Sequence, residues 1–334
     1  MRRTRRTRIV LVPLVLAVAV IAVFCVSLSV GDLDVPLRDV VTALTGAADP
    51  GTHFIVVELR LPRALLALLV GTAFGLAGAL FQALLRNPLA SPDVIGITQG
   101  ASAAAVLGSL GFALSGVPLS AAALAGALLT AAGIHALARR GHVSGARFVL
   151  VGIGIGAALS SITSYLLTRS QVAEAQNALV WLTGSLNGSG LAQVWPLLGC
   201  LLVLLPLTAL ASRDLEPLRL GEDTAAGLGA AVGRGRALLL ACAVALAGVA
   251  TAAAGPVAFV AFVSAPIARR LAPRSGAALV PSALTGALLV LCADFAAQHL
   301  MWSGQMPVGV VTSLIGAPYL LWLLARTNKS GRTG

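Results

Sequence analysis

The chain has 334 residues, of which 58% are hydrophobic and 10% charged, and its formal net charge is +11. A water-soluble globular domain carries about 25% charged residues, so this composition excludes a single soluble core. The charge does not indicate nucleic-acid binding, because the arginines form short clusters between apolar runs and only 4% of residues are aromatic. Apolar runs of about 18 or more residues recur throughout, which predicts an all-α protein that crosses a membrane many times.

Hydropathy over a window of about 19 residues predicts roughly ten transmembrane helices. Five arginines among the first eight residues precede an apolar stretch that is too long for a signal peptide. We therefore expect a retained first span with the N-terminus in the cytoplasm. The eighth predicted span is short and interrupted by proline and glycine. In chain order the predicted spans cover residues 9–29, 61–85, 94–114, 118–137, 148–168, 195–211, 237–254, 257–271, 277–297 and 308–325.

The distribution of positive charge supports this topology. With ten spans and a cytoplasmic N-terminus, 19 of the 23 basic residues lie on the cytoplasmic side, as the positive-inside rule requires. Omitting the eighth span would move the basic C-terminal residues to the other side. The basic residues expected outside are Arg38, Arg60, Arg63 and Arg169.

Few polar residues lie inside the predicted spans. Asp294 is the one acidic residue well within an apolar run. An intramembrane carboxylate suggests a functional site, but a lone one is explained more simply by capping a helix or pairing with an arginine. The histidines are scattered and the four cysteines lack metal-ligand spacing. No nucleotide-binding loop or hydrolase motif is present, so the chain is not expected to be an enzyme.

The longest polar stretch on the cytoplasmic side covers residues 213–229. Its leucines give it an amphipathic pattern, and Gly221 and Gly229 would break it into two short helices. The pattern alone is equally compatible with a docking site for a soluble partner and with an ordinary surface loop.

Five blocks of the chain resemble, in order, the FecCD family of permease subunits of ABC importers for ferric siderophores, heme and cobalamin. The strongest begins with Arg60-Leu-Pro-Arg63 and continues to the RNPLASPD sequence at 86–93. The others are WLTGSL at 181–186, LGEDTA at 220–225, GPVAFVA at 255–261 and PVGVVT at 307–312. The resemblance covers residues 9–326. Its motif residues with an expected structural role are Gln82, Arg86, Asn87, Pro88, Asp93, Asp294 and Pro307.

The resemblance implies a single polytopic permease domain, residues 1–334, with the type II ABC importer architecture. It would sit in the cytoplasmic (inner) membrane with both termini in the cytoplasm. A second permease subunit, identical or a paralogue, would complete a central path through the membrane. ATPase subunits would use ATP on the cytoplasmic side, and this chain itself would bind no cofactor and no metal. The segment at about 213–233 would couple to them through Leu220, Gly221, Glu222, Asp223, Thr224, Ala225, Leu228 and Gly229.

On the outer side, the resemblance implies an extracytoplasmic substrate-binding protein whose glutamates pair with Arg60 and Arg63. Anchoring of a span end in the membrane interface is the simpler alternative for these arginines. Two positions depart from the family pattern. Gln298 stands where many members carry a third docking arginine, and Pro266 lies one place away from the usual proline, which leaves the local helix geometry open.

A ferric siderophore is the expected cargo, with cobalamin or heme as alternatives. Few charged groups and no metal-ligand cluster occur in the spans, which suits a bulky chelate that keeps its metal wrapped. An ion-coupled secondary transporter is a more remote alternative, because it would need paired intramembrane carboxylates. Membrane lipid is the other expected partner.

Overall fold

The computed structural model describes residues 2–138, 145–220, 224, 227, 232–272, 277–299 and 306–330, and these residues form helices and connecting turns. In chain order the helices are α1 (Arg2–Ser29), α2 (Leu37–Leu44), α3 (Pro50–His53), η1 (Phe54–Arg60), α4 (Leu61–Leu84), α5 (Ile97–Phe112), α6 (Gly116–Ala138), α7 (Gly145–Arg169), α8 (Val172–Leu182), α9 (Leu191–Ala211), η2 (Ser212–Asp214), α10 (Leu215–Leu220), α12 (Val232–Ala254), α13 (Val260–Leu271), α14 (Leu279–His299) and α15 (Val308–Ser330).

The all-α membrane fold is confirmed, and each of the ten predicted spans coincides with one helix. Within the described residues, seven helical stretches are long and apolar enough to cross a membrane. Three predicted spans remain. Two of them correspond to α5 and α15, whose apolar helical stretches are shorter. The last, α13, has 12 residues and stays helical through Pro266, so the displaced proline does not break it. The short helices α2, α3, η1 and α8 were not predicted.

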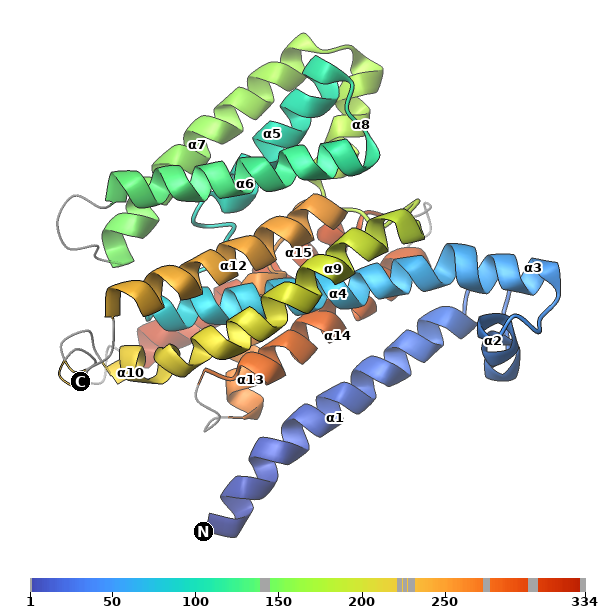
Figure 1. Cartoon of the computed structure of the whole chain (residues 1–334), viewed down its shortest axis with the longest axis horizontal. Helices are drawn as coiled ribbons and strands as arrows, with labels where there is room; N and C mark the ends of the chain where they lie inside the picture. The colour runs from blue at the N-terminus through green and yellow to red at the C-terminus, as the bar shows by residue number, and fades with distance from the viewer. Residues whose placement is uncertain are drawn as a thin grey trace.

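Helix α4 lies at the centre of the bundle (Figure 1). It makes its most extensive contacts with α14, followed by α12 and α13. Helices α5, α6 and α7 pack on one another and form a separate layer, which reaches the rest of the bundle through α12 (Figure 1). On the opposite side, α1 packs against α14. Accordingly α4 and α12 are largely buried, whereas α1, α6 and α7 expose most of their surface.

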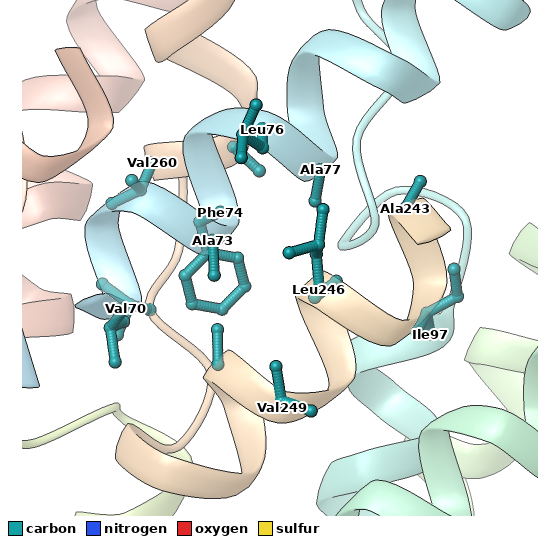
Figure 2. Close-up of a cluster of buried hydrophobic side chains, with 14 of the residues drawn as sticks. Val70, Ala73, Phe74, Leu76, Ala77, Ile97, Ala243, Leu246, Val249 and Val260 are labelled. Carbon is teal, nitrogen blue, oxygen red and sulfur yellow. The ribbon is translucent and has the colours of Figure 1, made fainter. Parts of the chain in front are cut away.

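The core around α4 consists of tightly fitted apolar side chains. Figure 2 shows Val70 and Phe74 of α4 beside Leu246 and Val249 of α12. Phe74 and Leu246 are fully buried. Because lipid tails are as apolar as these side chains, the hydrophobic effect contributes little between helices in a membrane, and close van der Waals contact holds the bundle together.

Glycines allow the closest helix approaches. A Cβ atom at Gly71 or Gly75 of α4 would overlap backbone carbonyls of α14, and one at Gly78 would overlap the carbonyl of Ala261 on α13. Gly286 of α14 faces Gly71 in the same way. These contacts explain why the spans contain so many small residues.

Candidate functional site

The amino-terminal end of α4 is preceded by a stretch of π-helix. The N–H of Leu61 bonds to the carbonyl of Val56, five residues earlier, and η1 itself runs from Phe54 to Arg60. Pro62 follows directly and has no N–H to donate to the turn before it. Segments of π-helix occur mostly as short insertions, often at functional sites. This one positions Arg60 and Arg63 at the start of the central helix.

Arg60 caps the carboxyl end of α1. Its Nη1 atom donates to the carbonyl of Leu28 at 2.9 Å and to that of Ser29 at 3.1 Å, and its Nη2 donates to the carbonyl of Leu33. The last carbonyls of a helix have no intrahelical partner, so the guanidinium stabilises this end. Gly31 permits the approach, since a Cβ there would collide with the guanidinium.

Arg63 forms a buried ion pair with Asp294 of α14. Its Nε lies 2.9 Å from Oδ1 and 3.0 Å from Oδ2, and its Nη2 lies 2.8 Å from Oδ1. Gln298, one turn along α14, donates from Nε2 to Oδ2 at 2.8 Å. The side chains of Arg63 and Asp294 are 11% and 5% exposed. Of the interpretations open for Asp294, the structure supports pairing with an arginine.

The structure thus brings Arg60 and Arg63 to one end of the molecule and engages both guanidinium groups in internal contacts. Their docking role stays a prediction. Gln298 occupies the position of the missing third arginine, and it completes the hydrogen bonding of Asp294. Sequence spacing alone could not reveal this network, because its two charged members are separated by 231 positions.

At the other end of α4, Gln82 joins this helix to α13. Its Nε2 donates to the carbonyl of Phe262 on α13 at 3.0 Å, and its Oε1 accepts a hydrogen bond from Nη2 of Arg269. The side chain is buried. A buried amide must satisfy both its donor and its acceptor, and here α13 supplies both partners. The predicted structural role of Gln82 therefore has a physical basis in the contact between α4 and α13.

Arg86 links the end of α4 to α10. Its Nη2 donates to the carbonyl of Leu218 at 2.7 Å. The N–H of Asn87 bonds to the carbonyl of Gln82, which is the helix-ending pattern that places a left-handed residue between them. That residue is Arg86, with φ of 48°. Glycine would adopt this conformation without strain, so the arginine side chain is kept at a backbone cost.

The turn between α4 and α5 is held by its own polar side chains. Oδ1 of Asn87 accepts from the N–H of Leu89 at 2.9 Å across Pro88. Asp93 lines a cavity of about 480 Å³ together with Phe259. Burial raises the pKa of the Asp93 carboxyl to about 6, although hydrogen bonds from the Thr98 side chain and the Phe259 backbone act in the opposite direction.

Only part of the predicted coupling segment is described. Its beginning forms η2 and α10, and Leu215 and Leu218 of α10 are buried against the bundle. Leu220 ends α10, and Thr224 is helical and exposed. The remaining predicted coupling residues, Gly221, Glu222, Asp223, Ala225, Leu228 and Gly229, lie outside the described residues.

Three of the sequence blocks meet at one place. The N–H of Ser185 bonds to the carbonyl of Ala254, and the N–H of Gly309 bonds to the carbonyl of Gly184. Pro307 precedes Gly309 at the start of α15, and its carbonyl accepts from Val310. The blocks at 181–186, 255–261 and 307–312 are therefore parts of one junction between α8, α12 and α15. Their separate positions in the sequence gave no indication of this.

Within the described residues, seven long apolar helical stretches and two shorter ones, packed through small residues and with polar links at both ends of a central helix, define a multi-pass membrane protein. Its fold is that of an ABC transporter permease. A structure described as an inward-facing conformation of a metal-chelate type ABC transporter matches with a TM-score of 0.82 and 25% identity, covering 94% of this chain and 98% of that one.

The sequence comparisons give the family. The FecCD transport family matches residues 19–326, and the chain belongs to it. The ferric enterobactin transport system permease protein FepG of Escherichia coli (strain K12) is 39% identical over 299 residues, covering 90% of this chain and 91% of that protein. The iron(3+)-hydroxamate import system permease protein FhuG of Bacillus subtilis (strain 168) is 35% identical over 335 residues, covering 98% and 100%.

Proposed function

We propose that this chain is the membrane-spanning subunit of an ABC importer that carries a ferric siderophore across the cytoplasmic membrane. Membership in the FecCD family over residues 19–326 is the observation that carries the proposal. Relatives whose names specify ferric enterobactin, iron(3+)-hydroxamate and achromobactin support this class of cargo. Cobalamin and heme are the competing cargoes.

The importer would need partners on both sides of the membrane. ATPase subunits would dock on the segment at 213–233 and use ATP, and a substrate-binding protein would deliver the chelate to the outer end of α4. A second permease copy or paralogue would complete the path. The positive charge of the predicted cytoplasmic loops supports this orientation, with both termini inside.

Uptake of radiolabelled ferric siderophores and labelled cobalamin, in a deletion strain and its complemented parent, tests the cargo. Loss of uptake of one ferric chelate with cobalamin entry intact is expected. Loss of cobalamin uptake alone would overturn the siderophore assignment, and unchanged uptake of both would contradict it as well.

The docking proposal is tested separately with Arg60→Glu and Arg63→Glu together. Uptake should be abolished while the ATPase subunits still copurify with the permease, because reversed charges would repel the glutamates of the binding protein. Arg63→Glu also breaks the buried pair with Asp294, so Arg60→Glu alone is tested beside the double variant, and loss of uptake supports docking only where the folded complex is recovered in wild-type yield. Arg38→Glu is the matched control, since Arg38 is exposed on α2 at the same end and has no predicted docking role. Unimpaired uptake by the double variant would refute the docking role.

A further inference from the structure

A groove of about 760 Å³ opens between α1 and the rest of the bundle. Its walls come from α1, α4, α9, α10 and α14, and most of the lining side chains are apolar. In Figure 1 the amino-terminal part of α1 lies well apart from α9 and α10. We call this feature the Thr208 groove. Its lining residues include Pro13, Leu76, Leu205, Thr208, Ser212 and Leu284.

Thr208 is the unusual residue of this groove. The residue is 2% exposed, and its hydroxyl has no hydrogen-bond partner among the described residues. Other threonines of the spans donate to the carbonyl four positions earlier, as Thr72 does to Leu68 at 2.8 Å and Thr251 to Ala247 at 2.8 Å. A buried hydroxyl without a partner is costly in protein and in lipid alike. Thr208 therefore lacks an acceptor that a ligand in the groove would supply.

The groove has a polar mouth and an apolar interior. Thr208, Ser212 and Glu216 lie near the end of α9 and on η2 and α10, at the membrane surface. Thr72 lines the deep end, about 18 Å along α4 from the end of that helix at a rise of about 1.5 Å per residue. This depth matches half of a hydrocarbon core of about 30 Å. One acyl chain of one leaflet has the polarity and length to fill such a groove.

The sequence ahead of Pro13 supplies positive charge that favours a phosphate, against the single carboxylate of Glu216 at the mouth. The sequence places five arginines in the first eight residues, just ahead of Pro13 in the wall of the groove. In the helical backbone of α1, residue 8 precedes Pro13 by about 7.5 Å toward the membrane surface. Basic residues at that level attract the headgroups of membrane phospholipids.

We propose that the Thr208 groove binds one phospholipid, with an acyl chain between α1, α4 and α9 and an ester oxygen accepting a hydrogen bond from the Thr208 hydroxyl. The bound lipid would fill the space between α1 and α9 and fix the position of α1. This proposal rests on the membrane-embedded fold and not on the cargo, so a different cargo would leave it intact.

The test measures phospholipid retained by the full-length chain after purification in mild detergent, by native mass spectrometry. One phospholipid per wild-type chain is expected. Thr208→Val keeps the shape but removes the donor, and retention should fall roughly 2- to 10-fold, the range expected for one hydrogen bond. Thr208→Ser keeps the donor and should retain lipid at the wild-type level.

A cavity-filling variant provides the second arm. Ala209→Phe projects a ring into the groove and should displace the lipid, whereas Val203→Phe, on the exposed face of the same helix, should not. Two results would overturn the proposal. One is a wild-type chain that retains no phospholipid, and the other is equal retention in Thr208→Val, Ala209→Phe and the wild type, which would indicate contact with bulk lipid only.

Discussion

The carboxylate of Asp294 neutralises the guanidinium of Arg63 inside the bundle and ties the amino-terminal end of α4 to α14. Both groups are desolvated, and Gln298 satisfies a further lone pair of the carboxylate. A buried ion pair adds little to the stability of the fold compared with apolar residues of the same shape. The loss of one member, however, leaves an uncompensated buried charge. The ion pair therefore fixes the position of α14 relative to α4. It does so at the end of the molecule where a binding protein is proposed to dock.

Removal of one member of this pair is expected to be strongly destabilising. Asp294→Ala should lower the free energy of unfolding by about 3–5 kcal/mol, because Arg63 would stay buried and charged. The double variant Arg63→Met with Asp294→Leu should cost much less than the two single changes together. Thermal unfolding of the wild type, Arg63→Met, Asp294→Leu and the double variant in detergent gives the coupling energy. Additive effects of the two substitutions would show that the pair does not act as a unit.

At the opposite end of α4, Arg86 is expected to transmit motion between the coupling segment and the bundle. Arg86→Gly relieves the left-handed backbone and removes the hydrogen bond to Leu218. Stability should therefore change little, while uptake falls about tenfold at an unchanged rate of basal ATP hydrolysis in the assembled complex. Arg86→Lys, which keeps a donor but not the geometry of the guanidinium, should be intermediate.

Uptake and ATP hydrolysis must be measured on the same preparation to separate coupling from assembly. A parallel loss of both activities in Arg86→Gly would indicate failed docking of the ATPase. Uptake at the wild-type level in Arg86→Gly would show that the hydrogen bond between Arg86 and the carbonyl of Leu218 does not transmit motion between the coupling segment and the bundle.

The membrane-spanning helices could be predicted because the bilayer imposes a length and a composition on each of them. The eighth span illustrates this, since charge counting required it even though α13 has only 12 residues. The partner of Asp294 could not be identified, because the ion pair joins residues 231 positions apart and many arginines were available. The short helices α2 and α8 were missed because they lie outside the spans, where hydropathy carries no signal.

The contact of α4 with α13 should not tolerate even one methyl group at Gly78. A Cβ at this position would overlap the carbonyl of Ala261, so Gly78→Ala must push the helices apart or fail to fold. We expect a loss of at least about 2 kcal/mol in the free energy of unfolding, comparable to overpacking in a dense core. The measurement is unfolding of the purified chain in a mixed-micelle titration.

Gly133→Ala in α6 is the control for this substitution. Among the described residues, no atom outside the adjoining backbone of α6 lies within 4 Å of a Cβ built there, and alanine is the better helix former by about 0.5–1 kcal/mol. The control should be neutral or slightly stabilised. Equal effects at the two positions would contradict the steric explanation.

The raised pKa of Asp93 predicts how the stability of the fold changes with pH. Its pKa in the folded chain is about 6, whereas an unfolded aspartate has a pKa of about 3.9. Between these two pKa values the folded state binds more protons than the unfolded state. Ionisation of Asp93 therefore destabilises the fold increasingly as the pH rises through this range.

Asp93→Asn keeps the size and removes the titration, and it should unfold at a higher temperature than the wild type at pH 7. The difference, on the order of 3 kcal/mol for a shift of about two pKa units, should shrink to about 1 kcal/mol at pH 4.5. Thermal unfolding of both proteins from pH 4.5 to 7 isolates this carboxyl from other titrating groups, and a difference that stays constant with pH would show that Asp93 is not the titrating group.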